Sequence, residues 1–326
     1  MHRLTSVPLA SIFYCFLMAS SAALSNTPNL GDNTCDSLLL VSSWKRNNVK
    51  IYDGCSGDFI RDLDSQNLVD GPLGILQAPD GDVLVVSETN GRLLKFDYNT
   101  LSVGQVVMGD DPTTEIVENN FIKNPVGAVM GANGQMYAAS YGTNEVVKID
   151  SQTWTIVEQM LPPDNGLIKG IDVGMTISSD GFLYLPGYDS DNIIKLNLTD
   201  KTVISVVAAG TQGLDAPRSI LLRDQEILVT AERSNKIMIF DLAGNFKEVL
   251  ADVARPTGMQ KDGDSHFIFN TSNAVYRVLN DGSEYKKVVQ SGSGDLAGGT
   301  FVYRLFKTMQ RPKAKTAALF NGVNYE

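Results

Sequence analysis

The sequence repeats one pattern of about 45 residues along most of its length, and this repeat limits the possible folds more than any other feature. The clearest copy is GPLGILQAPDGDVLVVSETNGRLLKFD at 71–97, and NPVGAVMGANGQMYAASYGTNEVVKID at 124–150 matches it almost position for position. Less regular copies occupy 172–197, 216–241, 255–280 and, incompletely, 37–54. Self-similarity at this period is typical of architectures in which each unit buries its faces on its neighbours.

Each copy predicts a sheet of four antiparallel strands. A Pro-x-Gly entry opens a short apolar strand, and a dipeptide such as Asp80-Gly81 then makes a tight hairpin, because that turn needs positive φ. A β-branched or aromatic strand follows, as at 83–86, and a polar loop leads to a third strand, as at 93–96. The linker to the next copy carries a weaker edge strand, as at 156–159.

Sheets of this size and spacing are typical of the blades of a β-propeller. The chain contains five complete copies and one partial copy, which lacks its first strand. The segment Gly298–Phe306 has no second strand after it, so it can supply the missing one. We therefore predict an all-β, six-bladed propeller over 37–306, closed by the C-terminal strand completing the N-terminal blade. A lead at 26–36 precedes this single domain, and a flexible tail at 307–326 follows it.

Residues 1–25 have the features of a secretory signal peptide. Arg3 precedes an apolar stretch at 8–18, and the small residues Ala23 and Ser25 stand where signal cleavage requires them. A membrane anchor is the alternative, but the apolar run is short for a span. No later segment approaches about 18 unbroken apolar residues, so we expect that the mature chain does not cross a membrane. We expect it to be secreted, extracellular and monomeric.

Two cysteines remain after cleavage of the signal peptide, and secretion would expose them to an oxidising environment. An isolated pair in a secreted chain predicts one disulfide, between Cys35 and Cys55. If Ser43 faces Asn48 across the first hairpin, these cysteines lie nearly opposite each other at its far end. The bond would then strengthen the blade whose closure depends on the chain ends.

Two features bear on the molecular surface. Asn197-Leu-Thr and Asn270-Thr-Ser fit the acceptor pattern for N-glycans, so Asn197 and Asn270 are predicted glycosylation sites. The formal net charge of −10 at pH 7 argues against nucleic acid or anionic lipid as a partner.

The repeat resembles a known group of proteins. VLVVSETNGRLLKFD and MYAASYGTNEVVKID are similar to the NHL-repeat pattern of six-bladed propellers. DVGMTISSDGFLYL resembles the wider superfamily of the gluconolactonase/senescence-marker and strictosidine-synthase-like proteins. The resemblance covers about 37–306. It implies the fold but leaves the activity open, since such propellers include lactonases, lyases, condensing enzymes and binding modules.

Blade geometry predicts where a site would lie. The innermost strand of each blade begins on the face where the second strand ends, so two sets of residues converge on one mouth of the central channel. The first set occupies the x of Pro-x-Gly or its equivalent: Leu73, Val126, Val173, Arg218, Thr257 and Thr300. The second set follows the second strand: Trp44, Glu88, Tyr141, Tyr188, Glu232 and Thr271.

The first set argues against a metal at this mouth. The resemblance implies that metal-dependent lactonases hold a divalent cation with Asn or Asp at the Pro-x-Gly ring. Here Val126, Val173 and Leu73 stand at ring positions and offer a hard cation no oxygen ligand. His266 begins a second strand and is expected on the opposite face, which counts against a histidine-dependent lyase or hydrolase. We therefore expect no metal and no other cofactor.

Carboxylates, a guanidinium and aromatic rings remain as candidates for chemistry. Glu88 and Glu232 are candidate acid/base residues, three blades apart and hence on opposite sides of the mouth. Arg218 forms either a structural ion pair with Glu232 or a grip on an anionic group. The candidate ligand-binding residues are Trp44, Tyr141, Tyr188, Arg218 and Thr257. The aromatic rings form either stacking walls for a ligand or packing between loops.

Three functions remain open from the sequence. The first is an extracellular binding protein that takes a small organic molecule, a glycan or a peptide at the mouth. The second is a metal-independent enzyme of hydrolase, lyase or condensing type, in which Glu88 or Glu232 does acid/base work. The third is a protein-interaction module that uses the blade tops, which a large exposed apolar patch would favour.

Overall fold

The structure is a computed structural model that describes residues 36–102, 104–110, 112, 121–132 and 134–307. These residues belong to one compact unit, Asn33–Glu326. Strands dominate this part of the chain, and short 3-10 turns supplement them at η2 (Trp44–Arg46), η3 (Thr211–Gly213) and η4 (Ser293–Asp295). No helix within the described ranges is long and apolar enough to cross a membrane.

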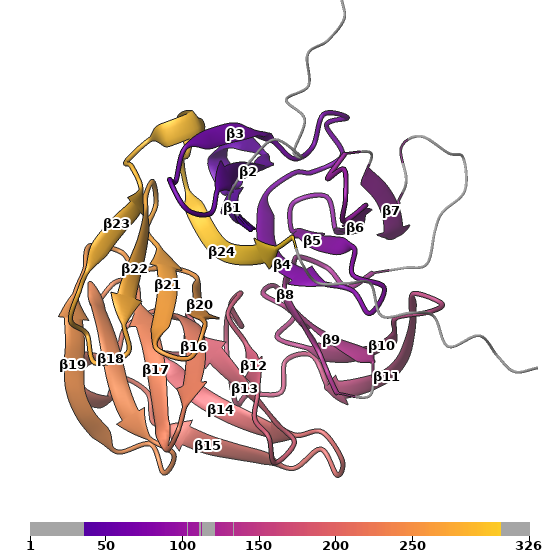
Figure 1. Ribbon diagram of the computed structural model, residues 1–326. Helices are drawn as coiled ribbons and strands as arrows, with labels where there is room; N and C mark the ends of the chain where they lie inside the picture. The colour runs from indigo at the N-terminus through magenta and orange to yellow at the C-terminus, as the bar shows by residue number, and fades with distance from the viewer. Residues whose placement is uncertain (1–35, 103, 111, 113–120, 133, 308–326) are drawn as a thin grey trace, which may run out of the picture. The chain divides into compact units, whose positions relative to one another are not determined.

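The strands form six four-stranded antiparallel sheets, which are the blades of a six-bladed propeller, as predicted (Figure 1). Blade 1 consists of β24 (Gly299–Phe306), β1 (Ser37–Ser43), β2 (Asn48–Asp53) and β3 (Phe59–Asp62). Blade 2 consists of β4 (Pro72–Gln77), β5 (Val83–Ser87), β6 (Arg92–Phe96) and β7 (Gly104–Met108). Blade 3 consists of β8 (Pro125–Met130), β9 (Gln135–Ser140), β10 (Val146–Asp150) and β11 (Thr155–Leu161).

The remaining blades follow the same order from the channel outward. Blade 4 consists of β12 (Thr176–Ile177), β13 (Phe182–Gly187), β14 (Asn192–Asn197) and β15 (Val203–Val207). Blade 5 consists of β16 (Pro217–Arg223), β17 (Glu226–Ala231), β18 (Lys236–Asp241) and β19 (Phe246–Asp252). Blade 6 consists of β20 (Met259–Asp262), β21 (His266–Asn270), β22 (Val275–Leu279) and β23 (Lys286–Val289).

The predicted closure of the ring is confirmed. β24 pairs antiparallel with β1, so that Leu38 faces Leu305 and Val41 faces Val302. β24 also contacts β4 of blade 2 and β20 of blade 6. The last strand therefore completes the first blade and joins it to both neighbours.

Buried hydroxyl groups tie the inner strands of neighbouring blades together. Thr300 Oγ1 of blade 1 donates to the Pro72 carbonyl of blade 2 at 3.0 Å. Thr257 Oγ1 of blade 6 donates to the Gly299 carbonyl of blade 1, also at 3.0 Å. These bonds satisfy polar groups around the channel, while apolar side chains pack between the faces of adjacent sheets.

The turn chemistry follows the sequence prediction in most blades. Gly81 and Gly181 adopt φ angles of 93° and 85° in the hairpins between the first and second strands. Blade 5 lacks a glycine there and places Asp224 at φ 48° instead. Aspartate tolerates this left-handed region better than most residues, which explains how the divergent copy keeps the layout.

Blade 4 departs from the expected pattern. Its inner strand is reduced to the two residues of β12, and Gly174 instead makes a parallel bridge to Ser219 of blade 5. A Cβ atom at residue 174 would lie 2.0 Å from Ser219 Oγ, so only glycine allows this approach. The shortened strand shifts which residue of this blade reaches the mouth.

Several sequence predictions concern residues beyond the described ranges. The signal peptide at 1–25, most of the lead at 26–36 and all of the tail at 307–326 except Lys307 lie outside them. Cys35 also lies outside, so the Cys35–Cys55 disulfide stays a prediction. The register on which that prediction depends is confirmed, because Ser43 faces Asn48.

The two predicted glycosylation sites differ in exposure. The side chain of Asn270 is fully buried at the end of β21, so the folded protein has no room for a glycan there. Asn197 is partly exposed at the end of β14, and its Oδ1 accepts the backbone N–H of Thr199. Glycosylation of Asn197 stays a prediction.

Candidate functional site

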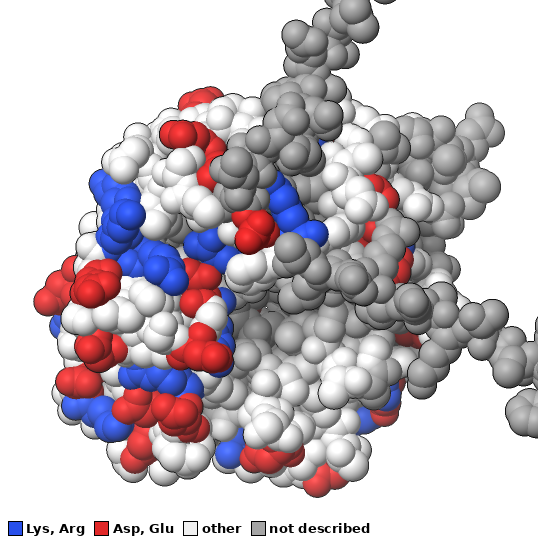
Figure 2. Space-filling view, in the orientation of Figure 1, with Lys and Arg blue, Asp and Glu red and all other residues white. Residues whose placement is uncertain are grey.

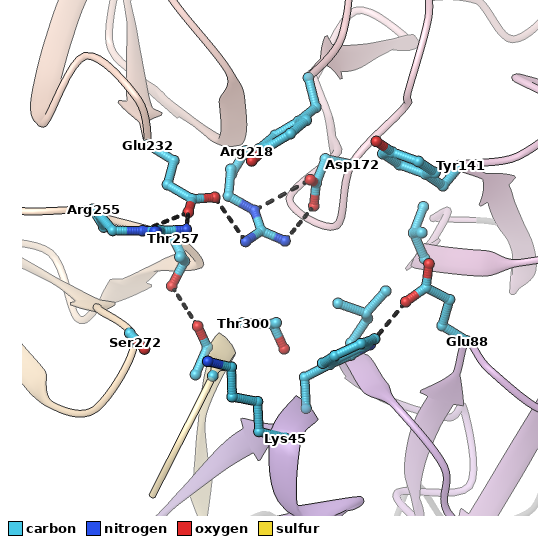
Figure 3. A pocket seen from close by; sticks show the side chains of 16 residues that line it. Lys45, Glu88, Tyr141, Asp172, Arg218, Glu232, Arg255, Thr257, Ser272 and Thr300 are labelled. Atoms are coloured by element: carbon cyan, nitrogen blue, oxygen red, sulfur yellow. Dashed lines mark hydrogen bonds and ion pairs between the residues drawn. The ribbon is translucent and has the colours of Figure 1, made fainter. Parts of the chain in front are cut away.

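A cavity of about 330 Å³ opens at the predicted mouth of the channel, and all six blades contribute to its wall (Figure 3). Seven of its residues are the candidates that the sequence identified: Trp44, Glu88, Tyr141, Tyr188, Arg218, Glu232 and Thr257. Leu73, Val126 and Thr300 of the predicted ring line it too. The structure therefore brings the acid/base candidates and the ligand-binding candidates into one cavity.

One repeated backbone hydrogen bond holds the second set of residues at the mouth. Glu88 donates its N–H to the Gly71 carbonyl at 2.9 Å, and Glu232 donates to the Ala216 carbonyl at 3.0 Å. Tyr141 and Tyr188 make the equivalent bond in blades 3 and 4. The acceptors in blades 2, 3 and 5 directly precede the inner strand, and in blade 4 Gly170 precedes Ile171, which forms an isolated bridge to Gly187. Each side chain is therefore fixed at the edge of the channel.

Six cavity residues were not predicted from the sequence: the glycines Gly298 and Gly299, and Lys45, Asp172, Arg255 and Ser272. Asp172 lines the cavity in place of the predicted Val173, whose side chain is buried in the apolar core between blades 2, 3 and 4. Ser272 lines it in place of Thr271. In both blades the residue beside the expected position reaches the mouth.

Arg218 lies at the centre of an ion-pair network in which Asp172 and Glu232 are buried and Arg255 is exposed, and Figure 3 shows its contacts as dashed lines. Its Nη1 is 3.0 Å from Glu232 Oε2, and its Nε is 3.1 Å from Asp172 Oδ2. Arg255 binds the other oxygen of Glu232, with its Nε donating to Oε1 at 2.9 Å. Arg218 thus forms the structural ion pair with Glu232 that was one of its two expected roles, and a second pair with Asp172.

The network balances its own charge. Burial acts to lower the pKa of Arg218, but attraction to Asp172 and Glu232 raises it above its usual value. Burial likewise acts to raise the pKa of Glu232, but Arg218 and Arg255 outweigh it and hold that pKa below its usual range. At Asp172 burial outweighs the attraction of Arg218 and raises the pKa above its usual value. With both carboxylates ionised, two guanidinium groups face them, and the network adds no net charge to the cavity.

Glu88 differs from the other carboxylates of the cavity. Its Oε2 accepts a hydrogen bond from Trp44 Nε1 at 2.9 Å, and no basic side chain of the described chain lies within ion-pair distance of it. Burial raises the pKa of Glu88, and the Trp44 hydrogen bond only partly opposes that shift. Figure 3 places Glu88 across the cavity from Glu232, as the blade count predicted.

Aromatic side chains flank the carboxylates. The ring centroids of Tyr141 and Tyr188 are 6.4 Å apart, and the guanidinium of Arg218 lies 5.4 Å from the Tyr188 ring. Tyr141 donates its hydroxyl to Asp189 Oδ2 at 2.7 Å. Trp44 is 41% exposed, so part of its ring is open to a ligand. The two tyrosines are held by packing and hydrogen bonds, whereas Trp44 offers a free face.

The remaining chemical candidates are placed as follows. His266 begins β21, the strand whose other end leads to Ser272 at the mouth, so this histidine lies at the opposite end of the blade. Among the residues with described positions, no group of three His, Cys, Asp or Glu side chains is arranged to hold a metal ion.

No known protein family and no curated protein matches the sequence. Solved structures share its fold. A chain of a nidogen/laminin complex aligns with a TM-score of 0.66 at 9% identity, covering 83% of this chain and 99% of that one. A streptogramin B lyase aligns with a TM-score of 0.55 at 16% identity, covering 85% and 92%.

A catalytically inactive virginiamycin B lyase from Staphylococcus aureus with quinupristin also aligns, with a TM-score of 0.57 at 14% identity, covering 84% and 94%. At these identities the likeness shows the six-bladed propeller fold alone. Membership of the NHL-repeat group or of the gluconolactonase superfamily stays a prediction.

Proposed function

We propose that this chain is a secreted propeller that binds a small organic ligand at the mouth cavity, with Glu88 as the acceptor for a positively charged group. One observation carries the proposal. Glu88 is the cavity carboxylate that has no basic partner within the described chain, and it lies beside the partly exposed ring of Trp44. A carboxylate next to an aromatic face suits an organic cation such as an amine.

The ion-pair network supports this choice of charge. Arg218 was the candidate grip for an anionic group, but Asp172 and Glu232 already neutralise it together with Arg255. An anionic ligand would have to compete with two buried carboxylates for Arg218. A cationic ligand can instead form a charge-assisted hydrogen bond with Glu88, which has no basic partner within the described chain. Such a bond stabilises a half-buried carboxylate more than a bond from a neutral donor does.

Glu88→Gln tests this proposal. We expect the wild-type protein to retain amines from a mixed set of small amines, sugars and carboxylic acids, measured by native mass spectrometry. The variant should lose about tenfold or more in affinity, because a hydrogen bond between charged groups is replaced by a neutral one. Glu145→Gln is the matched control, since Glu145 follows the second strand of blade 3 but does not line the cavity. Equal retention by Glu88→Gln and wild type would exclude Glu88 as the acceptor.

The pH dependence of binding gives a second test of the same group. Only ionised Glu88 attracts a cation, and burial raises the pKa of Glu88 above its usual value. Affinity for an amine should therefore fall as the pH drops through this raised pKa, at a higher pH than an ordinary glutamate requires. Calorimetric titrations from pH 8 to about pH 4 measure the profile. A profile that Glu88→Gln leaves unchanged would assign the proton to another group.

A metal-independent enzyme is the second candidate function. A carboxyl group whose pKa is raised by burial can accept and return a proton nearer neutral pH, and Glu88 has this property. The propellers that share the fold include lyases. If a retained compound is converted, Glu88→Gln should abolish the conversion, and unchanged activity would exclude Glu88 as the acid/base.

The third candidate, a protein-interaction module, has less support. The larger exposed apolar side chains lie mostly on outer strands of different blades, such as Phe59 on β3, Val157 on β11 and Ile204 on β15. Within the described ranges these side chains lie on separate blades and do not form the single large patch that would favour docking by a blade top.

A further inference from the structure

A second cavity, of about 410 Å³, lies where blade 6 meets the closing strand β24. It shares no lining residue with the mouth cavity. Arg277 of β22 and Lys286 of β23 line it from blade 6, and Arg304 of β24 lines it from blade 1. The seam that closes the propeller therefore carries three basic side chains in one hollow.

The charge of this cavity opposes that of the protein. Asp262 is the acidic residue among its described lining residues, so three cations against one carboxylate leave a surplus of two positive charges. The whole chain carries a formal charge of −10. In Figure 2, Lys and Arg side chains gather over the region that β22 and β23 form in Figure 1.

Asp262 orients the two guanidinium groups without using all of their donors. Arg277 Nε lies 2.6 Å from Asp262 Oδ2, and Arg304 Nε lies 2.6 Å from Asp262 Oδ1. Arg304 Nη1 donates hydrogen bonds to Ser37 Oγ at 2.9 Å and to the Gly54 carbonyl at 2.8 Å. Its role is to fix β24 to the first hairpin.

Arg277 and Lys286 keep donors available. The described residues make no hydrogen bond with the Arg277 Nη atoms or with Lys286 Nζ. The two residues face each other across β22 and β23. Like charges directly opposite each other destabilise a sheet. Arg277 shares the carboxylate of Asp262 with Arg304, and Lys286 has no ion pair among the described residues, so this pair of charges is not fully neutralised.

We propose that this cavity binds a tetrahedral oxyanion, phosphate or sulfate, free or as a monoester, between Arg277 and Lys286 and beside Arg304. The planar guanidinium of Arg277 can bind two oxygens of such an anion, and the ammonium of Lys286 can bind a third. The anion would neutralise the surplus charge and link blade 6 to the closing strand. Since the unfolded chain does not bring these residues together, binding should stabilise the folded propeller.

The test uses the full chain with inorganic phosphate, inorganic sulfate and phenyl phosphate, at an ionic strength held constant with NaCl. We expect saturable binding by calorimetry and a melting temperature that rises with each anion. Lys286→Gln should weaken binding about tenfold or more, because it removes one charge-assisted contact. Lys286 is exposed, so this variant should fold normally. Arg277→Gln should weaken binding at least as much.

Lys247→Gln is the matched control, because Lys247 lies on β19, the outer strand of the neighbouring blade, and carries the same charge. Retained affinity in this variant, with loss in Lys286→Gln, supports the site. Tighter binding of phenyl phosphate than of inorganic phosphate supports it as a monoester site. The proposal is overturned if no anion binds saturably, if NaCl alone raises the melting temperature equally, or if Lys247→Gln weakens binding as much as Lys286→Gln.

Discussion

A chain that ends at Gly298 should show no cooperative unfolding transition. Without β24, the first blade loses its inner strand and the buried side chains of Val302 and Leu305. Leu39 and Val41, which are fully buried in the same apolar cluster as Val302, lose the strand that covers their channel side. Burying each such side chain is worth about 1.5–3 kcal/mol, and the total stability of a domain is only about 5–15 kcal/mol.

The matched control for this truncation is a chain that ends at Lys307, which keeps all of β24. It should unfold in one cooperative transition at a melting temperature close to that of the full chain. Thermal unfolding followed by circular dichroism compares the two. A chain ending at Gly298 that melts cooperatively near the control temperature would show that the ring does not depend on its closing strand.

Replacing Arg218 by Met should cost about 3–5 kcal/mol of unfolding free energy. Asp172 is 3% exposed, and its carboxylate is paired with Arg218. Removal of the guanidinium leaves that carboxylate buried without a cation, whereas Glu232 keeps Arg255. Urea denaturation of the variant and the wild type measures the difference.

Two further variants separate the ion pair from simple packing. Arg233→Met removes another guanidinium from the same Tyr188 ring, which it approaches to 4.6 Å, but its side chain is 52% exposed. We expect a loss below about 1 kcal/mol for it. Adding Asp172→Asn to Arg218→Met should restore part of the stability, because no charge then stays unpaired. A double variant less stable than Arg218→Met would contradict this account.

The fold was predictable because each repeat carries its own signals. Apolar alternation marked the strands, and the Asp-Gly and Asn-Gly turns marked the hairpins. The unpaired segment that became β24 indicated how the ring closes. Blade 4 was the exception, since its bridge from Gly174 to Ser219 depends on two blades meeting and has no signature within a single copy.

The sequence predicted most of the repeat positions that lie at the mouth, but it predicted fewer of the side-chain interactions between them. Equivalent places in the repeat identified Glu88, Tyr188 and Glu232, because the same backbone bond fixes each of them. Asp172 was missed because the shortened inner strand of blade 4 moves the mouth position by one residue. Arg255 was missed because it precedes the Pro-x-Gly entry, and its side chain reaches Glu232 from the next blade.

We propose above all that the mouth cavity holds a small ligand against Glu88 and Trp44. The most direct test is a crystal structure of the protein soaked with the amine that native mass spectrometry shows to be retained. We predict electron density in the cavity, with the amine nitrogen within hydrogen-bond distance of a Glu88 carboxylate oxygen. Density for the amine elsewhere on the propeller, with the mouth filled by the protein's own side chains, would contradict the account.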